Sequence, residues 1–269
     1  MRIALIGCGS IGQAIASAVA QKRLPLELEI VFDADGERAD LLAGRVGTKV
    51  AKSIDDILAS EAEVVVEAAS QEAVRAFAKK VLEGGKSLLV MSVGALADDD
   101  FRRELEETAR KNGVKIYLPS GAVGGLDALK GAALGGVDEV ILITTKPPQG
   151  FKGNAYLAGL GIDLDEIKEA RVLYEGDARG AVEKFPANVN VAMTLSLAGI
   201  GAERTMVRVV VDPRAERNTH EVRVRGAFGE FAFRVENVPS RENPRTSYLA
   251  ALSAIATLKR IASPFQVGT

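Results

Sequence analysis

The feature that most constrains the fold of this chain is a glycine-rich turn close to the N-terminus. Gly7, Gly9 and Gly12 form a GxGxxG motif after an apolar run at residues 2–6 and before a segment whose apolar residues recur at helical spacing. In such a turn, one glycine allows the tight bend, one lets the backbone approach a pyrophosphate, and one lets the helix pack closely on the strand. The motif therefore predicts a dinucleotide-binding unit in which the helix N-terminus faces the anion.

An acidic residue supports this interpretation. Asp33 follows the predicted second strand and lies 21 residues after Gly12, where a carboxylate accepts hydrogen bonds from the adenosine ribose. A carboxylate also repels a 2′-phosphate, so Asp33 favours NAD over NADP, although Arg38 nearby would soften this preference. The alternative, a glycine-rich turn without a ligand, fits this context less well. The predicted cofactor-binding residues of the first half are Gly7, Gly9, Ser10, Ile11, Gly12, Asp33, Ala69 and Ser70.

The first half of the chain alternates short apolar runs with amphipathic segments, which is typical of parallel strands joined by crossover helices. The predicted strands are residues 2–6, 28–32, 64–67, 87–91 and 115–118, with a weaker strand near Lys49. Helical apolar stripes lie within residues 11–19, 74–82 and 101–109. Gly84, Gly85 and the Asn112, Gly113 pair stand where two helices should end. These patterns predict an α/β fold with a Rossmann domain, a doubly wound parallel sheet, at residues 1–119.

The character of the chain changes after Pro119, where six glycines crowd into residues 121–136, and we place the domain boundary there. The strands expected beyond it, residues 139–145, 205–211, 221–225 and 230–235, look antiparallel, and residues 226–229 predict a hairpin. Helices are expected at residues 187–197 and 244–262, with Asn243 capping the second and Pro244 in its first turn. Residues 120–269 are thus predicted as an α+β domain with a largely antiparallel or mixed sheet, whose last helix could pack back on the first domain.

Composition excludes several classes of protein. The 269 residues include 34 Lys plus Arg and 36 Asp plus Glu, a net charge of −2, so the chain lacks the basic excess that nucleic-acid binding needs. No apolar run approaches the roughly 18 residues of a membrane helix. One His and one Cys make a zinc site improbable, and no metal is expected. Cys8 cannot form an internal disulfide and reads as a small residue tolerated in the loop; with no signal-like N-terminus, the reducing cytoplasm is the expected location.

The single histidine is the first candidate for catalysis. His220 begins a predicted strand in which residues 220, 222 and 224 share one face, so it points the same way as Val222 and Val224. It therefore faces the covered side of the sheet. An imidazole can exchange protons near neutral pH, where its ordinary pKa of about 6.5 is useful. A buried histidine that only forms a local hydrogen bond fits the pattern slightly better.

Two further segments allow two interpretations each. Asn188 and Asn190 stand in an otherwise apolar stretch and could cap a helix, or could bind a carboxamide or carboxylate as neutral donors and acceptors. The segment from Ser120 to Gly125 could be a flexible hinge between domains. It could equally be a run of backbone donors at the carboxyl end of a sheet, where open sheets bind ligands.

At this level of detail, the sequence resembles the L-aspartate dehydrogenase family over nearly its whole length. The motifs that carry the resemblance are GCGSIG at 7–12, VEAASQ at 66–71, SGAVGGLDAL at 120–129, KFPANVNVA at 184–192, NTHEVRVRGAFGEF at 218–231 and NPRTSYLAALS at 243–253. The first is generic, and the last four together are specific. The resemblance implies that an N-terminal Rossmann domain is joined to an α/β domain that carries the active site and contributes to a homodimer interface.

The resemblance also implies an activity and residue roles. Family members interconvert L-aspartate with iminosuccinate or oxaloacetate plus ammonia, use NAD or NADP, and are associated with NAD biosynthesis. The family's catalytic histidine falls on His220. Its nicotinamide contacts resemble Ala122 and an asparagine of the ANVN segment, for which we choose Asn190, with Asn188 as the close alternative. Ser120 and Asn188 are the expected substrate-binding residues, and no basic residue can be selected for the substrate carboxylates.

Two rival functions are compatible with a dinucleotide fold. One is another two-domain reductase that acts on a small carboxylate, an aldehyde or an imine. The other is a nonenzymatic NAD(H) sensor. Such a sensor should carry an effector or DNA-binding module. Two domains take up the chain and its net charge is −2, which leaves little room for such a module.

Overall fold

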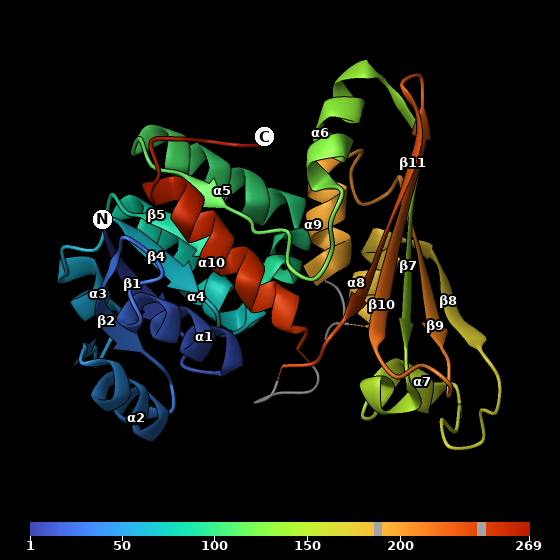
Figure 1. Ribbon diagram of the computed structural model, residues 1–269, viewed down its shortest axis with the longest axis horizontal. Coiled ribbons are helices and arrows are strands. Elements are labelled where there is room, and N and C mark those ends of the chain that lie inside the picture. The colour runs from blue at the N-terminus through green and yellow to red at the C-terminus, as the bar shows by residue number, and fades with distance from the viewer. Residues whose placement is uncertain (186–189, 241–245) are drawn as a thin grey trace. The chain divides into compact units, whose positions relative to one another are not determined.

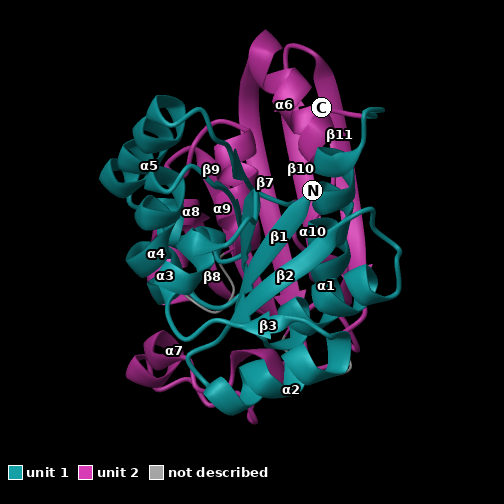
Figure 2. Ribbon diagram, turned by 90° about the vertical axis from the view of Figure 1, so that its left-hand side faces the viewer, with its two compact units in different colours: residues 1–119, 251–267 teal, residues 120–250, 268–269 magenta. Residues whose placement is uncertain are grey.

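The computed structural model describes residues 1–185, 190–240 and 246–269. The chain divides into two compact units, shown in different colours in Figure 2. Unit 1 comprises Met1–Pro119 and Ala251–Val267, and unit 2 comprises Ser120–Ala250 and Gly268–Thr269. Each unit is built around its own sheet, and each is described by itself below.

Unit 1 contains a six-stranded parallel sheet in the order β3-β2-β1-β4-β5-β6. Its strands are β1 (Arg2–Ile6), β2 (Glu27–Phe32), β3 (Lys49–Val50), β4 (Val64–Glu67), β5 (Ser87–Val90) and β6 (Ile116–Tyr117). The parallel Rossmann-like sheet predicted from the alternating pattern is confirmed, including the short strand near Lys49. β4 is buried throughout, as expected for a central parallel strand with both faces covered.

The helices of unit 1 begin and end as local sequence dictates. They are α1 (Ser10–Ala20), α2 (Gly36–Val46), α3 (Ile54–Ala59), α4 (Gln71–Glu83), η1 (Val93–Ala97) and α5 (Asp99–Lys111), and most of α10 (Tyr248–Ala262). Asp35, Ser70 and Asp98 cap α2, α4 and α5 by accepting backbone hydrogen bonds with their side chains. The predicted helix ends are confirmed, because Gly85 (φ 72°) and Gly113 (φ 67°) follow α4 and α5 in the left-handed conformation. The sequence analysis did not identify α2 and α3.

Unit 2 contains a five-stranded mixed sheet in the order β11-β10-β7-β9-β8. Its strands are β7 (Val137–Lys146), β8 (Arg171–Asp177), β9 (Thr205–Val211), β10 (Asn218–Gly226) and β11 (Gly229–Asn237). The expected hairpin is confirmed, since Gly226 pairs with Gly229 across a loop of Ala227 and Phe228. The predicted largely antiparallel or mixed sheet is confirmed as a mixed sheet, in which β7 and β9 pair in parallel and not, as their sequences suggested, antiparallel. Between them the chain makes a crossover that includes β8, a strand the sequence analysis missed.

Helices cover one face of this sheet. The helical elements of unit 2 are α6 (Leu126–Gly135), η2 (Pro148–Phe151), α7 (Ala155–Gly159), α8 (Ala178–Lys184) and α9 (Asn190–Ala198). α6 contacts β10, and α8 and α9 contact β9, so these three helices lie on the same side of the sheet (Figure 1). Within the described part of the chain, no helix of unit 2 covers the opposite face (Figure 1).

Two predicted helices are described over only part of their predicted ranges. The helix expected at 187–197 corresponds to α9, and its first residues, with Asn188, lie outside the described residues. The helix expected from residue 244 begins only at Tyr248, because Ser247 instead forms a β-bridge with Pro239. The predicted start is therefore wrong, and Asn243 and Pro244 themselves lie outside the described residues.

The covered face of the sheet carries the core of unit 2. Val222 and Val224 are fully buried in a cluster with Leu142, Val207 and Leu129. His220 lies on the same face and is 4% exposed, so the orientation predicted from strand alternation is confirmed.

Candidate functional site

The glycine loop of unit 1 has the geometry that a pyrophosphate requires. Gly7 has φ of 99°, and a Cβ there would lie 2.5 Å from the carbonyl oxygen of Ala68. A Cβ on Gly12 would lie 2.0 Å from the carbonyl oxygen of Gly7, so these two positions are closed by the protein's own backbone. A Cβ on Gly9, by contrast, would meet no atom within 4 Å. The open space beside Gly9 is where a bound dinucleotide would approach the loop.

The first helix leaves this space suited to an anion. Gly9 is the N-cap of α1, no side chain caps the helix, and its first turn carries no acidic residue. Ser10 and Ile11 are the first residues of the helix and are half-buried. The backbone N–H groups of this turn and the helix dipole therefore favour a phosphate rather than a side chain of the protein.

Asp33 lies directly after β2 and beside the glycine loop. Its Oδ2 accepts a hydrogen bond from the Cys8 amide at 2.7 Å, and its Oδ1 accepts one from the Asp35 amide at 2.9 Å. Two hydrogen bonds leave acceptor capacity on the carboxylate for a ribose hydroxyl. Arg38 Nη1 is 3.8 Å from Oδ2. Burial raises the pKa of the Cys8 thiol to about 12, which favours packing over reactivity at that residue.

A buried carboxylate that the sequence analysis did not select organises the next loops. Glu67 ends β4 and is 2% exposed, and its oxygens accept hydrogen bonds from the Ala69, Met91 and Ser92 amides and from the Ser92 hydroxyl. Burial raises the pKa of this carboxyl, and the hydrogen bonds oppose the rise. Glu67 thereby joins the loops after β4 and β5 at the carboxyl edge of the sheet.

Both other predicted cofactor residues of unit 1 lie in the loop after β4. Ala69 is exposed and donates its amide hydrogen to Glu67, while Ser70 caps α4 by accepting from the Ala73 amide. A cofactor lying along this edge of the sheet would pass them, as open parallel sheets bind ligands at the carboxyl ends of their strands.

In unit 2, five polar residues gather at one end of the covered face of the sheet. We call Thr144, Lys146, Asn218, His220 and Asn237 the polar cluster; all are buried. His220 pairs with Thr144 across β10 and β7, and its Nδ1 lies 3.0 Å from the Thr144 hydroxyl. Because Thr219 pairs with Thr145, the next residues outward, Asn218 and Lys146, are level with one another. Asn218 in turn pairs with Asn237 of β11.

The electrostatics of the cluster keep its histidine neutral. Burial, and to a lesser extent the nearby charge of Lys146, lower the pKa of His220 to about 3. Burial also lowers the pKa of Lys146 to about 8. Near neutral pH the cluster therefore combines a lysine that is largely cationic with an imidazole that is neutral.

The loop that follows Pro119 packs onto this cluster. Asn237 Nδ2 donates a hydrogen bond to the carbonyl oxygen of Ala122 at 3.1 Å. Gly124 lies against the ring of Phe233, where a Cβ would come within 2.2 Å of a ring carbon. The structure thus brings Ala122 and His220, two residues predicted from the sequence, onto one face of unit 2.

The remaining predicted site residues of unit 2 are not members of the polar cluster. Ser120 begins the same loop and is half-buried. Asn190 begins α9, is exposed, and accepts a hydrogen bond from the Thr194 hydroxyl at its backbone carbonyl. Asn188 lies outside the described residues.

Four members of the cluster, Thr144, Lys146, Asn218 and Asn237, were not predicted from the sequence as site residues. The sequence does carry a signal for Thr144 and Lys146, because Val140, Leu142, Thr144 and Lys146 alternate along β7 and so share its buried face. The predicted strand ended at residue 145, which removed Lys146 from that comparison. Asn237 lies on β11, two strands from β7 in the sheet, and gave no such signal, because β11 is otherwise largely exposed.

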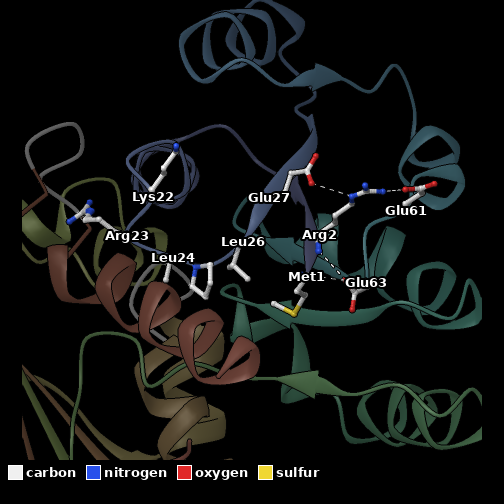
Figure 3. Close-up of a pocket in the computed structure, with 10 residues that line it drawn as sticks. Met1, Arg2, Lys22, Arg23, Leu24, Leu26, Glu27, Glu61 and Glu63 are labelled. Atoms are coloured by element: carbon white, nitrogen blue, oxygen red, sulfur yellow. Dashed lines mark hydrogen bonds and ion pairs between the residues drawn. The ribbon is translucent and has the colours of Figure 1, made fainter. Parts of the chain in front are cut away.

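The cavity of about 850 Å³ shown in Figure 3 is unrelated to either site. It is lined by residues at the amino ends of β1 and β2, where Arg2 contacts Glu27 and Glu61 (Figure 3). The glycine loop lies at the carboxyl end of β1. Residues 1–185, 190–240 and 246–269 contain no group of three or more His, Cys, Asp or Glu side chains that could hold a metal ion. No helix among the described residues is long and apolar enough to cross a membrane.

These features define a class of protein. A parallel sheet with a pyrophosphate-type glycine loop, joined to a second unit with a buried histidine and lysine, is the architecture of an NAD(P)-dependent oxidoreductase. The family model "Aspartate dehydrogenase, C-terminal" matches residues 127–261, and the model "Homoserine dehydrogenase, NAD binding domain" matches residues 7–119. The chain belongs to the L-aspartate dehydrogenase family.

Individual relatives agree with this assignment. The chain is 49% identical to the L-aspartate dehydrogenase of Methanosarcina mazei and 42% identical to that of Methanocaldococcus jannaschii, in each case over 100% of both chains. Among solved structures, it is similar to the aspartate dehydrogenase of Thermotoga maritima, with a TM-score of 0.76 and 29% identity over 100% of this chain and 99% of that one.

The glycine loop predicts opposite results for two substitutions. Gly9→Ala should leave the melting temperature unchanged, because its Cβ meets no atom, and should weaken NADH binding about tenfold or more, equivalent to about 1.4 kcal/mol. Gly7→Ala should lower the melting temperature, because it combines a positive φ with a backbone clash. Calorimetry and NADH fluorescence titration measure both quantities. A Gly9→Ala protein that binds NADH like the wild type would contradict the placement of the cofactor.

The buried histidine predicts a dependence of stability on pH. The imidazole has a pKa of about 3 in the folded chain and 6.5 as its ordinary value, so between these values the unfolded chain binds the extra proton. The free energy of unfolding should therefore fall as the pH drops from 6.5 towards 3, by up to about 1.4 kcal/mol per pH unit. Urea denaturation of the wild type and of His220→Gln isolates this contribution.

Because His220 is the chain's only histidine, nuclear magnetic resonance reports its titration without ambiguity. The ring should remain neutral at pH 5 to 6 in the folded protein. An imidazole that titrates near 6.5 in the folded state would refute the electrostatic description of the cluster.

Proposed function

We propose that this chain is a cytoplasmic, NAD-preferring L-aspartate dehydrogenase that interconverts L-aspartate with oxaloacetate and ammonia through iminosuccinate and feeds NAD biosynthesis. The observation that carries the chemistry is the buried polar cluster, in which His220 bonds to Thr144 through Nδ1 and lies in the field of Lys146. The names of full-length relatives at 42–49% identity support the substrate.

Unit 1 would bind the cofactor. The amides at the N-terminus of α1 and the open space beside Gly9 suit the pyrophosphate. Asp33 would accept hydrogen bonds from the adenosine ribose, and its charge would disfavour a 2′-phosphate. Arg38, 3.8 Å from that carboxylate, would weaken the preference for NAD over NADP without reversing it. When bound, NADH supplies the hydride that reduces the imine carbon.

Unit 2 would handle protons and substrate. In the reductive direction ammonia adds to the ketone of oxaloacetate, and loss of water from the carbinolamine requires proton transfer. His220 uses Nδ1 for Thr144, which leaves Nε2 for exchange with the substrate. In the oxidative direction the same nitrogen would take a proton from the water that attacks the imine. Ala122, Asn190, Ser120 and Asn188 keep their proposed roles as nicotinamide and substrate contacts.

The first test is the initial rate of NADH oxidation with oxaloacetate, measured with and without ammonium. Oxidation should require both compounds, and NADPH should support a lower kcat/KM because of Asp33. His220→Ala should lower kcat by about 10²–10⁴ and leave the Kd of NADH unchanged. His220→Asn, which keeps a hydrogen-bonding group but cannot act as a general acid or base, should lose as much.

Other results would favour the rival functions. Oxidation of NADH without ammonium would identify a hydroxy acid dehydrogenase. Tight NADH binding with no oxidation of any small keto acid or imine would favour a sensor. Near-normal turnover of His220→Ala would remove His220 from the mechanism.

We also propose that the chain forms a homodimer through the face of the unit 2 sheet that no described helix covers. An apolar strip on that face includes Val172, which is 47% exposed, and Met206, which is 40% exposed. Its other members are Ile141, Ile143 and Val210. Sedimentation equilibrium should give twice the chain mass of 28.4 kDa, and Met206→Glu should shift the mass towards one chain. A wild-type monomer at micromolar concentration would contradict this proposal.

A further inference from the structure

One hydroxyl of unit 2 lies where the pattern of its strand favours an apolar side chain. Thr144 is on the buried face of β7, in line with Val140 and Leu142, and is 3% exposed. Its neighbour across the sheet on β9 is Val209, which is also 3% exposed. A valine would fill the same space as Thr144 without bringing a polar group into the core. The hydroxyl therefore indicates a polar partner on the other side of the strand.

That partner is the imidazole of the other neighbouring strand. His220 is level with Thr144 on β10, and the Thr144 hydroxyl lies 3.0 Å from its Nδ1. On its far side His220 pairs with Val235 of β11, which offers the ring no polar side chain. Within the described part of the chain, the Thr144 hydroxyl is thus the group that bonds to Nδ1 of the ring.

The sheet itself fixes this contact. β7 is paired with β10 on one side and with β9 on the other, so the backbone of Thr144 is held from both sides. Threonine is branched at Cβ, which restricts rotation about χ1. The hydroxyl oxygen is therefore presented to the imidazole at a defined place.

The hydroxyl can serve the ring in two ways. It can donate to Nδ1 when that nitrogen is bare, or accept from Nδ1 when that nitrogen carries a hydrogen. A neutral imidazole has one such hydrogen, so a hydrogen on Nδ1 leaves a free electron pair on Nε2. The proton exchange at Nε2 proposed above needs that electron pair. It therefore requires the arrangement in which Thr144 accepts from Nδ1.

We propose that Thr144 is a positioning residue, whose hydroxyl accepts the Nδ1 hydrogen of His220 and so directs proton exchange to Nε2. The inference rests on the aspartate dehydrogenase activity proposed above. As the oxygen of water bonds to the imine carbon, the π electron pair of C=N moves to nitrogen and the water proton passes to Nε2. The hydrogen bond from Nδ1 stays in place and strengthens, because its donor is then part of a cation.

The experiment compares four full-length proteins: the wild type, Thr144→Val, Thr144→Ser and Thr145→Val. Thr144→Val keeps the shape of the side chain and removes the hydroxyl, whereas Thr144→Ser keeps the hydroxyl. Thr145→Val is the matched control, because Thr145 is the next residue of β7 and points to the opposite face. NADH oxidation with oxaloacetate and ammonium gives kcat and KM. Fluorescence titration and calorimetry give the Kd of NADH and the melting temperature.

Nuclear magnetic resonance of isotope-labelled protein saturated with NADH reports the ring directly. His220 is the only histidine, and the couplings of Nδ1 and Nε2 to the hydrogens on the ring carbons distinguish the two nitrogens. Near neutral pH the ring hydrogen should lie on Nδ1 in the wild type, in Thr144→Ser and in Thr145→Val. In Thr144→Val it should move wholly or partly to Nε2, because the acceptor beside Nδ1 has been removed.

The kinetic effect should fall on kcat. Thr144→Val should lower kcat about tenfold or more, the effect of one hydrogen bond lost from the transition state, and should leave the KM of oxaloacetate and the Kd of NADH unchanged. Thr144→Ser should recover most of the lost kcat. Thr145→Val should behave like the wild type.

Three results would overturn the inference. A wild-type ring with its hydrogen on Nε2 would show that the hydroxyl donates to Nδ1. A kcat of Thr144→Val equal to that of the wild type would show that the hydrogen bond does not assist proton exchange. An equal loss of kcat in Thr144→Val and Thr144→Ser, with lower melting temperatures and an unchanged ring hydrogen, would show a packing role only. Failure of the proposed function is seen separately, as absence of NADH oxidation by the wild type with oxaloacetate and ammonium.

Discussion

The antiparallel pairing of β7 with β10 is the interaction on which the chemistry of unit 2 depends. It places Thr144 opposite His220 and brings Lys146 level with Asn218, so that every one of these side chains faces the helix-covered side. A shift of the register by one residue would turn His220 to the uncovered face. The valines that follow it, Val222 and Val224, are fully buried and make such a shift unfavourable, so the hydrophobic core also fixes the positions of the reacting groups.

Unit 1 depends on a different constraint, the close approach of backbone segments around the glycine loop. Gly7 touches the backbone after β4, and Gly12 touches Gly7. The loop after β4 is in turn fixed by the buried carboxylate of Glu67, which also binds the loop after β5. The cofactor edge is thus shaped by main-chain contacts that tolerate no side chain at two positions, while the third glycine is left free for the ligand.

Much of this could be predicted from the sequence, because it depends on local patterns. The strand–turn–helix unit around Gly7 and the burial of His220 follow from the periods of strands and helices. The parallel pairing of β7 with β9 could not be predicted, because it depends on how a long crossover returns to the sheet. Asn237 was missed for a related reason: its importance arises from a hydrogen bond to Ala122, 115 residues away in the chain, which no local pattern reports. The start of α10 was predicted too early: Ser247 pairs with Pro239 in a β-bridge, and the helix begins at Tyr248.

The polar cluster also explains why this part of the sheet is not simply apolar. A methionine in place of Lys146 and a leucine in place of His220 would fill similar space without the cost of burying polar groups. The groups present instead keep the imidazole neutral, with a pKa of about 3, so that near neutral pH it is a weak base and holds no extra proton to donate. Proton exchange at His220 near neutral pH would therefore require a bound ligand to raise this pKa, because burial and the charge of Lys146 both lower it.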